Sequence, residues 1–298
     1  MKLLLATDGA PDATAALVAA TRTFRTEDVQ ADLLCVVPRM YALEVADPKG
    51  RQIVDGAKND YEVRMGHEAE RIMAVALETL AGEGLDARPR TDFGSPGDVI
   101  LRWSSSYDVT VVGAHDRFGR TQPGVGPVGS QVISRCPSSI LVGRESAAGA
   151  PGRVLLCVDG SVAATEALRQ MVARVRLEDV EVTVMHVVEL PWLRLGLDLD
   201  WQPTDSVDDG ALLDELTRRG AETVVEAAAL ELERHGVRSR TLIREGLPEV
   251  QILSEADVGE YDLIVLGATG NSDLTEVTTG SVAIRVAEYA PATVWVVR

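Results

Sequence analysis

The sequence contains the same pattern twice, and this internal repeat constrains the fold more than any other feature. Residues 3–9 match residues 154–160 at an offset of 151. The last part of each copy, residues 107–144 and 261–298, aligns without a gap at an offset of 154. A repeat of this length is typical of a duplicated domain, because each copy has about the usual size of one, roughly 150 residues.

The boundary between the copies falls in a stretch of small residues. Residues 146–152 read Ser-Ala-Ala-Gly-Ala-Pro-Gly, a composition typical of a linker. A length of 298 residues leaves room for a hydrophobic core in each copy. The sequence therefore predicts one domain at residues 1–145 and a second at residues 152–298.

Each copy alternates short apolar runs with longer segments of helical periodicity, which is typical of β-α-β units and a parallel sheet. The apolar runs are nearly continuous, as in strands that are covered on both faces. In the second copy the expected strands are residues 153–158, 181–188, 238–244, 262–267 and 293–297. The predicted fold class is α/β, with two tandem domains that each hold a five-stranded parallel sheet between helices.

Apolar residues at helical spacing predict which side chains form the core. The positions are Ala164, Leu168, Met171, Val172 and Val175 in the helix after the first strand of the second copy; Leu213, Leu216, Val224, Val225, Ala228 and Leu232 in a helix at about 210–235; and Ala69, Ile72, Met73, Ala76, Leu77 and Leu80 in its counterpart. We expect these side chains to be core rather than ligand contacts. Either Ser161 or Asp159 is expected to cap the first of these helices.

The acidic composition limits the partners of this chain. With 46 acidic and 29 basic residues, the formal net charge is −17, which repels nucleic acids and anionic lipids. No apolar run approaches the 18 or so residues of a membrane helix, and Asp8 interrupts the apolar N-terminus. Cys35, Cys136 and Cys157 lack metal-ligand spacing and are expected to be core thiols. We expect a cytoplasmic protein that binds neither nucleic acid nor membrane.

A glycine motif follows the fourth strand of the second copy. Gly267 and Gly270 come first, and after nine residues Gly280 and Ser281 begin the last helix. In an open parallel sheet, ligands bind beyond the carboxyl ends of the strands, and Asp159 ends the first strand at that edge. Glycines let the backbone approach phosphate oxygens, while a hydroxyl and free amides at a helix start can bind an anion. The pattern predicts a phosphate site; the alternative is that the glycines only shape the loop.

These motifs resemble those of the universal stress protein family, in which an aspartate ends the first strand, His-Val ends the second and Gly-x2-Gly-x9-Gly-Ser/Thr follows the fourth. The resemblance covers nearly all of both copies and implies two tandem Rossmann-like domains of the adenine nucleotide alpha hydrolase-like type. It implies that Asp159 contacts the ribose of ATP and that Val187 packs against the adenine. It also implies that Mg²⁺ bridges the phosphates, without a cage of protein ligands. The residues implied to hold the phosphates are Gly267, Gly270, Gly280 and Ser281.

The first copy departs from this motif at two positions. An ungapped alignment pairs Asp116 with Gly270 and Pro127 with Ser281. The aspartate adds negative charge and a Cβ atom, and the proline removes a hydroxyl and an amide donor, so we expect no triphosphate there and about one nucleotide per chain. An alternative alignment starts the last helix at residues 129–130 and shortens it by three residues. A nucleoside, another small ligand or an empty pocket are all open for this copy.

The sequence has no P-loop, no paired histidine metal motif and no nucleophile elbow. We therefore expect no catalytic residue and no protein-held metal, and we expect His186 to be packed and hydrogen-bonded. The leading hypothesis is an ATP-binding stress or regulatory protein whose bound nucleotide is sensed by another protein or by the oligomer. The alternatives are a slow ATPase or nucleotide hydrolase and an interaction scaffold without nucleotide. The resemblance also implies a homodimer.

Overall fold

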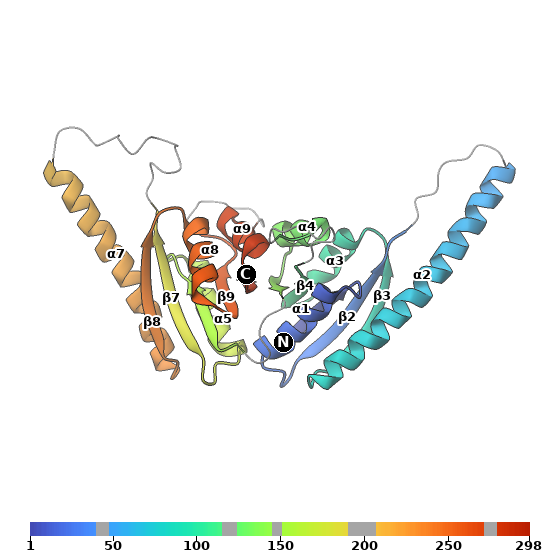
Figure 1. Cartoon of the computed structure of the whole chain (residues 1–298), viewed down its shortest axis with the longest axis horizontal. Helices are drawn as coiled ribbons and strands as arrows, with labels where there is room; N and C mark the ends of the chain where they lie inside the picture. Colours follow the sequence, from blue (N-terminus) through green and yellow to red (C-terminus); the bar gives the residue numbers. More distant parts are fainter. Residues whose placement is uncertain (40–47, 115–123, 145–150, 190–206, 271–278) are drawn as a thin grey trace. The chain divides into compact units, whose positions relative to one another are not determined.

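The computed structural model describes residues 1–39, 48–114, 124–144, 151–189, 207–270 and 279–298, and the side chains of all of these except residues 48–55 and 207–214. The chain forms two compact units, the first drawn mainly from residues 1–145 and the second mainly from residues 146–298. Both are α/β, as Figure 1 shows. The expected linker lies mostly outside the described residues.

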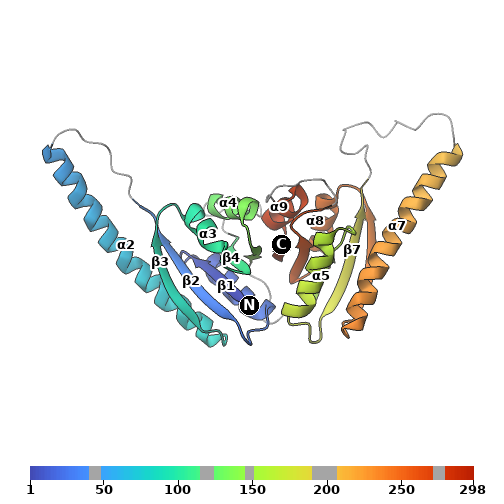
Figure 2. The ribbon, with the colours of Figure 1, turned by 180° about the vertical axis from the view of Figure 1, so that it is seen from behind.

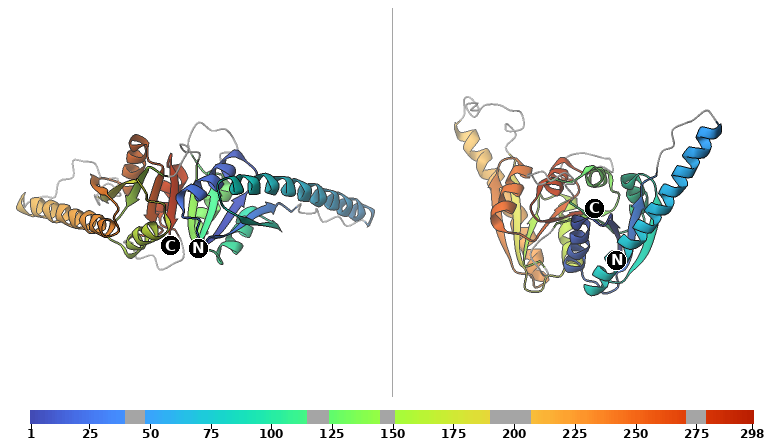
Figure 3. Two further views of the ribbon diagram at one scale, coloured as in Figure 1. Left: turned by 90° about the horizontal axis from the view of Figure 1, so that it is seen from below. Right: turned by 45° about the vertical axis from the view of Figure 1, so that its right-hand side comes forward.

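The first unit holds a five-stranded parallel sheet in the order β3-β2-β1-β4-β5. Its strands are β1 (Lys2–Thr7), β2 (Gln30–Val37), β3 (Ala87–Phe93), β4 (Val109–Gly113) and β5 (Ser139–Gly143). Its helices are α1 (Pro11–Thr23), α2 (Pro48–Gly82), α3 (Pro96–Ser104) and α4 (Pro127–Arg135). Figure 3 shows α2 as the longest helix of this unit.

The second unit repeats this topology, with the parallel strand order β8-β7-β6-β9-β10. Its strands are β6 (Arg153–Cys157), β7 (Glu181–Val188), β8 (Ser239–Glu245), β9 (Leu263–Gly267) and β10 (Thr293–Val297). Its helices are α5 (Val162–Arg174), α7 (Val207–Arg234), α8 (Pro248–Gly259) and α9 (Ser281–Tyr289). All five strands begin and end within one residue of the sequence-based expectation.

Helices cover both faces of the sheet in the second unit. On one face α5 packs beside α7, and on the other α8 packs beside α9. Figure 1 has α8 in front of the sheet, and Figure 2, the view from behind, has α5 in front. The central strands β6 and β9 are buried almost throughout, as expected of strands covered on both sides. The predicted fold class is confirmed.

The strand order places a ligand site at one edge of each sheet. The chain leaves β6 toward β7 on one side and later returns to β9 on the other side, so the crevice between β6 and β9 is a switch point of the topology. The register pairs Val154 with Leu263 and Leu156 with Val265, so both strands end at the same edge. The loops after β6 and β9 therefore face each other.

Most of the predicted core is confirmed, but four of the expected positions are only half-buried: Ile72, Leu77, Val172 and Val224. Among the expected positions in α5, Leu168 and Met171 are buried, as are Ala69 and Leu80 in α2. Leu216 was expected in the core but is 56% exposed, so this prediction was wrong. It lies five residues before the buried Ala221, which is about 140° around the helix at 100° per residue, so it faces away from the sheet. Leu213 falls in the part of α7 whose side chains are not described.

No helix of the described residues is both long enough and apolar enough to cross a bilayer.

Asp92, at the end of β3, ties this edge strand to α3. Its carboxylate accepts hydrogen bonds from Trp103 Nε1 at 2.8 Å, from Arg102 Nη2 at 2.7 Å and from the Phe93 amide at 2.7 Å. The hydrogen bond from Trp103 is the largest of the causes that lower the pKa of Asp92 below its usual range, and the Arg102 charge adds to it.

We expect Asp92→Asn to lower the free energy of unfolding by about 1 kcal/mol near neutral pH, because charge-assisted hydrogen bonds are lost. Since the folded-state pKa of Asp92 is depressed, its contribution is present above the unfolded pKa and is lost as the pH falls through the folded pKa. Denaturant melts of both proteins between neutral and acid pH should therefore converge at low pH. A difference that is independent of pH would contradict the role of the charge, and the exposed Asp86→Asn is the control.

Candidate nucleotide site

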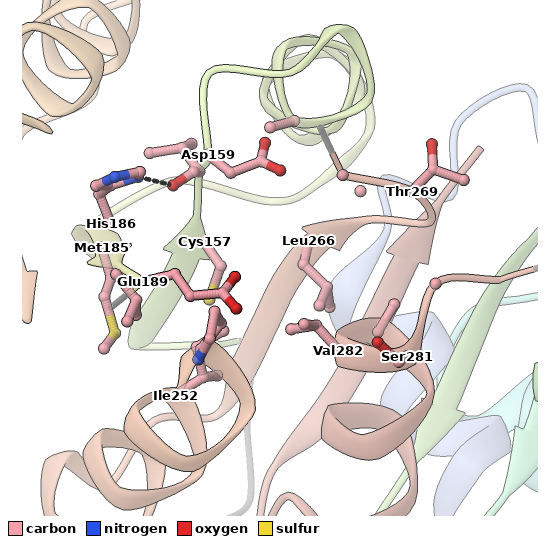
Figure 4. A pocket seen from close by; sticks show the side chains of 18 of the residues that line it. Cys157, Asp159, Met185, His186, Glu189, Ile252, Leu266, Thr269, Ser281 and Val282 are labelled. Carbon is pink, nitrogen blue, oxygen red and sulfur yellow. Dashed lines mark hydrogen bonds between the residues drawn. The ribbon is translucent and has the colours of Figure 1, made fainter. Parts of the chain in front are cut away.

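A cavity of about 600 Å³ opens at the carboxyl edge of the second sheet, between the ends of β6, β7 and β9 and the start of α9 (Figure 4). Its volume lies within the range of small-molecule sites, roughly 300–1,000 Å³. The structure brings all six residues predicted for the site to the lining of this one cavity: Asp159, Val187, Gly267, Gly270, Gly280 and Ser281.

The loop after β6 fixes the position of Asp159. Gly160 has a φ of +78°, a left-handed conformation that glycine adopts without strain. Ser161 is the N-cap of α5, and its hydroxyl accepts a hydrogen bond from the Ala164 amide at 3.1 Å. Asp159 Oδ1 accepts from the Ser161 amide at 3.0 Å. Of the two candidate caps, Ser161 is therefore the cap, and Figure 4 shows the Asp159 side chain pointing across the cavity toward the loop of Thr269.

The two glycines after β9 have different reasons to be glycine. A Cβ atom at Gly267 would lie 2.8 Å from the backbone carbon of Ala163, so this glycine is required by the packing of α5 on β9. A Cβ atom at Gly270 would lie 2.7 Å from Asp159 Oδ2, on the wall of the cavity. The alternative that the glycines only shape the loop thus accounts for Gly267, whereas Gly270 keeps the space beside Asp159 clear.

At the start of α9, first-turn backbone amides lie at the cavity without a partner among the described residues. The Gly280 amide donates to the Ala268 carbonyl at 2.7 Å, so this N–H group is already used. What Gly280 offers a ligand is the space left by the absence of a side chain. No described side chain caps α9, in contrast to α5. The first-turn residues Ser281, Val282 and Ala283 all line the cavity. Backbone amides at a helix N-terminus have no partner within the helix and carry positive charge, so this end of the cavity favours an anion.

The end of β7 forms a less polar wall. His186 is half-buried, and its Nδ1 donates to the Val158 carbonyl at 2.8 Å, which confirms the expectation that it is packed and hydrogen-bonded. Val187, Met185 and Ile252 also line the cavity. Such a wall suits a flat apolar group such as a nucleobase.

The motif analysis did not identify several lining residues, among them Glu189, Thr217 and Thr269. Glu189 directly follows the last residue of β7, so the rule that ligand contacts gather after strand ends could have identified it. Figure 4 shows its carboxylate directed toward Leu266 and Val282. Thr217 lies on α7 in no recognisable motif, and no sequence signal points to it.

The described lining contains no lysine or arginine. Arg298 Nη2 donates to Thr279 Oγ1 at 2.6 Å, which brings a guanidinium next to the residue that precedes Gly280. No group of three His, Cys, Asp or Glu side chains among the described residues could hold a metal ion. A bridging Mg²⁺ would therefore take most of its ligands from phosphate and water, with Asp159 and Glu189 as the carboxylates on the wall.

Cysteine burial agrees with the expectation of core thiols, since Cys35, Cys136 and Cys157 are all free and buried. Cys157 also lines the cavity, and burial raises the pKa of its thiol to about 12. This thiol is therefore protonated and a poor nucleophile at neutral pH.

The first unit has a second cavity, of about 510 Å³, at the equivalent edge of its own sheet. Here α4 begins at Pro127 after the N-cap Gly126, as α9 begins at Ser281 after Gly280, and both helices have nine residues. The ungapped alignment is therefore confirmed, and the alternative with a start at residues 129–130 is wrong. Asp116, the other predicted departure from the motif, lies outside the described residues.

Comparison with known proteins agrees with this geometry. The model of the universal stress protein family matches residues 1–144 and 151–298. A universal stress protein of Methanocaldococcus jannaschii is 29% identical over 147 residues, which are 49% of this chain and 81% of that protein. One of Bacillus subtilis is 26% identical over 148 residues, 49% of this chain and 98% of that protein.

Among solved structures, a universal stress protein from Archaeoglobus fulgidus aligns over 100% of this chain and 98% of its own, with a TM-score of 0.64 and 19% identity. At this identity the likeness shows the fold, a pair of Rossmann-like units. Because the family model matches both repeats over almost their whole length, the chain belongs to the universal stress protein family, as a tandem two-domain member.

Proposed function

We propose that the C-terminal domain, residues 152–298, binds ATP and that the protein is a nucleotide-dependent regulator of the stress response. The observation that carries this proposal is the N-terminus of α9, which no described side chain caps and which meets a cavity wall kept bare at Gly270. Backbone amides at a helix N-terminus donate hydrogen bonds to phosphate oxygens, and backbone without side chains lets the phosphates approach them.

The other lining residues suit the rest of the nucleotide. The Asp159 carboxylate, fixed by its bond to the Ser161 amide, is a hydrogen-bond acceptor for ribose hydroxyls. Val187 lines the cavity and would pack against the adenine. Gly267, Gly280 and Ser281 complete the phosphate end. When Mg²⁺ is bound with the nucleotide, it neutralises phosphate charge that the carboxylates Asp159 and Glu189 would otherwise repel.

The N-terminal domain, residues 1–145, is not expected to hold a triphosphate. Pro127 has no N–H group at the position where α9 presents the Ser281 amide. We therefore propose one ATP per chain. We also propose that the protein is cytoplasmic and forms a homodimer. Regulation would require that ATP bind one state of the protein more tightly than another, so that a protein partner or the oligomer senses the bound nucleotide.

We expect nucleotide released from the heat-denatured protein to be ATP, at about one molecule per chain. The measurement is anion-exchange chromatography of the supernatant, repeated after reloading of stripped protein with ATP and Mg²⁺. ADP together with measurable turnover would favour the slow ATPase, and no nucleotide under either condition would favour the scaffold. Two ATP per chain would contradict the assignment of the site to one domain.

A further inference from the structure

The cavity of the N-terminal domain lies at the carboxyl edge of that domain's own sheet, the position equivalent to the candidate ATP site of the C-terminal domain. The residues that line it have different chemistry. It is formed by the ends of β1, β2 and β4, the inner face of α2 and the starts of α3 and α4. Its volume of about 510 Å³ is large enough for a small organic ligand.

Equivalent contacts fix the correspondence between the two cavities. A Cβ atom at Gly9 would meet Ile72 of α2 at 2.8 Å, and one at Gly160 would meet Val224 of α7 at 3.2 Å. This shared contact sets an offset of 152 between the two helices, so Met65 in the first cavity corresponds to Thr217 in the second.

With this correspondence, polar positions of the C-terminal cavity become less polar in the N-terminal one. Four pairs of lining residues show this change: Cys35 for His186 and Pro38 for Glu189 at the strand offset of 151, Met65 for Thr217 at the helix offset of 152, and Pro127 for Ser281 at the offset of 154. Thr7 in place of Val158 is the one change in the opposite direction among these described lining residues. The remaining walls are mostly aliphatic. They include Leu34, Val36, Ile72, Ile100 and Val112. The loss of these polar groups removes hydrogen-bond partners for a nucleotide and favours an apolar ligand body.

The charges that remain in this lining are negative. Asp8 and Glu68 reach the cavity from the end of β1 and from α2, and no lysine or arginine is among its described residues. Glu68 is paired with Arg71 on its own helix, at 3.4 Å, and such exposed pairs contribute little. Asp8 Oδ1 accepts from the Ala10 amide at 3.0 Å, which holds the carboxylate at the strand end.

Besides burial, the pKa of Cys35 reflects the negative charges of both Asp8 and Glu68. Burial raises the pKa of its thiol to about 11, and the negative charges of Asp8 and then Glu68 add to this effect. Cys35 is 3% exposed and belongs to the lining. A positive charge placed beside it would therefore lie within the field of two carboxylates from different elements.

We propose that the N-terminal cavity binds a small amphipathic organic cation, an ammonium group attached to an apolar body, in place of a nucleotide. The apolar body fills the aliphatic part of the cavity, and the ammonium lies near Asp8 and Glu68. Pro127 removes one of the first-turn amides that could attract an anion at this end of α4, and those of Val128 and Gly129 remain. The proposal does not depend on ATP binding by the C-terminal domain.

The test uses three compounds with one apolar body, a phenylbutyl group, and different charge: 4-phenylbutylamine, 4-phenylbutanol and 5-phenylpentanoate. We expect titration calorimetry at neutral pH to rank the amine at least tenfold tighter than the alcohol, with no detectable binding of the acid. Glu68→Gln should weaken the amine about tenfold and leave the alcohol unchanged. Glu70→Gln, on the same helix but outside the described lining, should leave both unchanged.

Two cysteines report which cavity is occupied, because Cys35 lines the N-terminal one and Cys157 the C-terminal one. At about 90% occupancy the amine should slow iodoacetamide labelling of Cys35 about tenfold, since only the free tenth reacts, and should not slow that of Cys157. Cys136, which lines neither cavity, corrects for general opening of the fold. Mass spectrometry of the three peptides gives the rates.

The proposal is overturned if none of the three compounds binds, if the acid binds as well as the amine, or if the amine protects Cys157 rather than Cys35. Equal effects of the two glutamate substitutions would also overturn it, because the charge at Glu68 would then have no special position. Thermal melts of both variants establish that they are folded, which the exposure of both side chains leads us to expect.

Discussion

Gly270→Asp should abolish ATP binding, with a loss of affinity of at least about 100-fold, or roughly 3 kcal/mol. The new side chain would start from a Cβ atom 2.7 Å from Asp159 Oδ2, so its carboxylate would lie next to an existing negative charge. It would also occupy the wall along which the proposed phosphates pass. Two carboxylates this close repel each other, and both repel a triphosphate. The repulsion is strong where water is excluded.

Two further substitutions separate the effect of the added Cβ atom from that of the added charge. Gly270→Ala adds the Cβ atom without the charge and should weaken ATP less than Gly270→Asp does. Gly82→Asp adds the same carboxylate at the end of α2, where nothing lies within 4 Å of a new Cβ atom, and should leave affinity unchanged. Titration calorimetry with Mg-ATP measures all three. If Gly270→Asp binds ATP like the parent protein while its melting temperature is unchanged, the phosphates do not lie beside Gly270.

How well the fold could be predicted from the sequence depended on the kind of signal. Strands buried on both faces are short continuous apolar runs that end where polar residues begin, so β6, β9 and β10 could be placed within one residue. The edge strand β8 is mostly polar, and its bounds were also predicted within one residue. The helical stripe of α7 was harder to predict, because apolar residues on an exposed face look the same in sequence as those in the core. Leu216 was assigned to the core for this reason, although it lies on the opposite side from Val225.

The candidate site shows the same division. Residues in a recognised motif, such as Asp159 and Ser281, could be named in advance, and the structure brings them to one cavity. Three-dimensional contacts were needed for the rest. The sequence allowed either Asp159 or Ser161 as the cap of α5, and only the bond from the Ala164 amide distinguishes them. Likewise, Gly267 looks like a ligand residue in sequence, whereas its close approach to Ala163 requires glycine with or without a ligand.

The N-terminal domain itself provides a substitution for the other end of the phosphate site. Pro127 occupies the first position of α4, and that helix still runs for nine residues, as α9 does. Proline is tolerated at this position because the N–H group it removes has no partner within the helix. Ser281→Pro should therefore keep α9 intact while it removes an amide and a hydroxyl from the cavity.

We expect Ser281→Pro to weaken ATP about 100-fold, because hydrogen bonds to charged groups contribute roughly 1.5–3 kcal/mol each. Ser281→Ala removes the hydroxyl alone and should weaken ATP about tenfold or less. The reciprocal Pro127→Ser, in the other domain, should change neither affinity nor stoichiometry, since the lining there keeps Glu68 and Met65. Calorimetry with Mg-ATP gives the affinities, and circular dichroism and thermal melts monitor the helix. Equal losses for proline and alanine would assign the contact to the hydroxyl, and no loss for either would move the phosphates away from the N-terminus of α9.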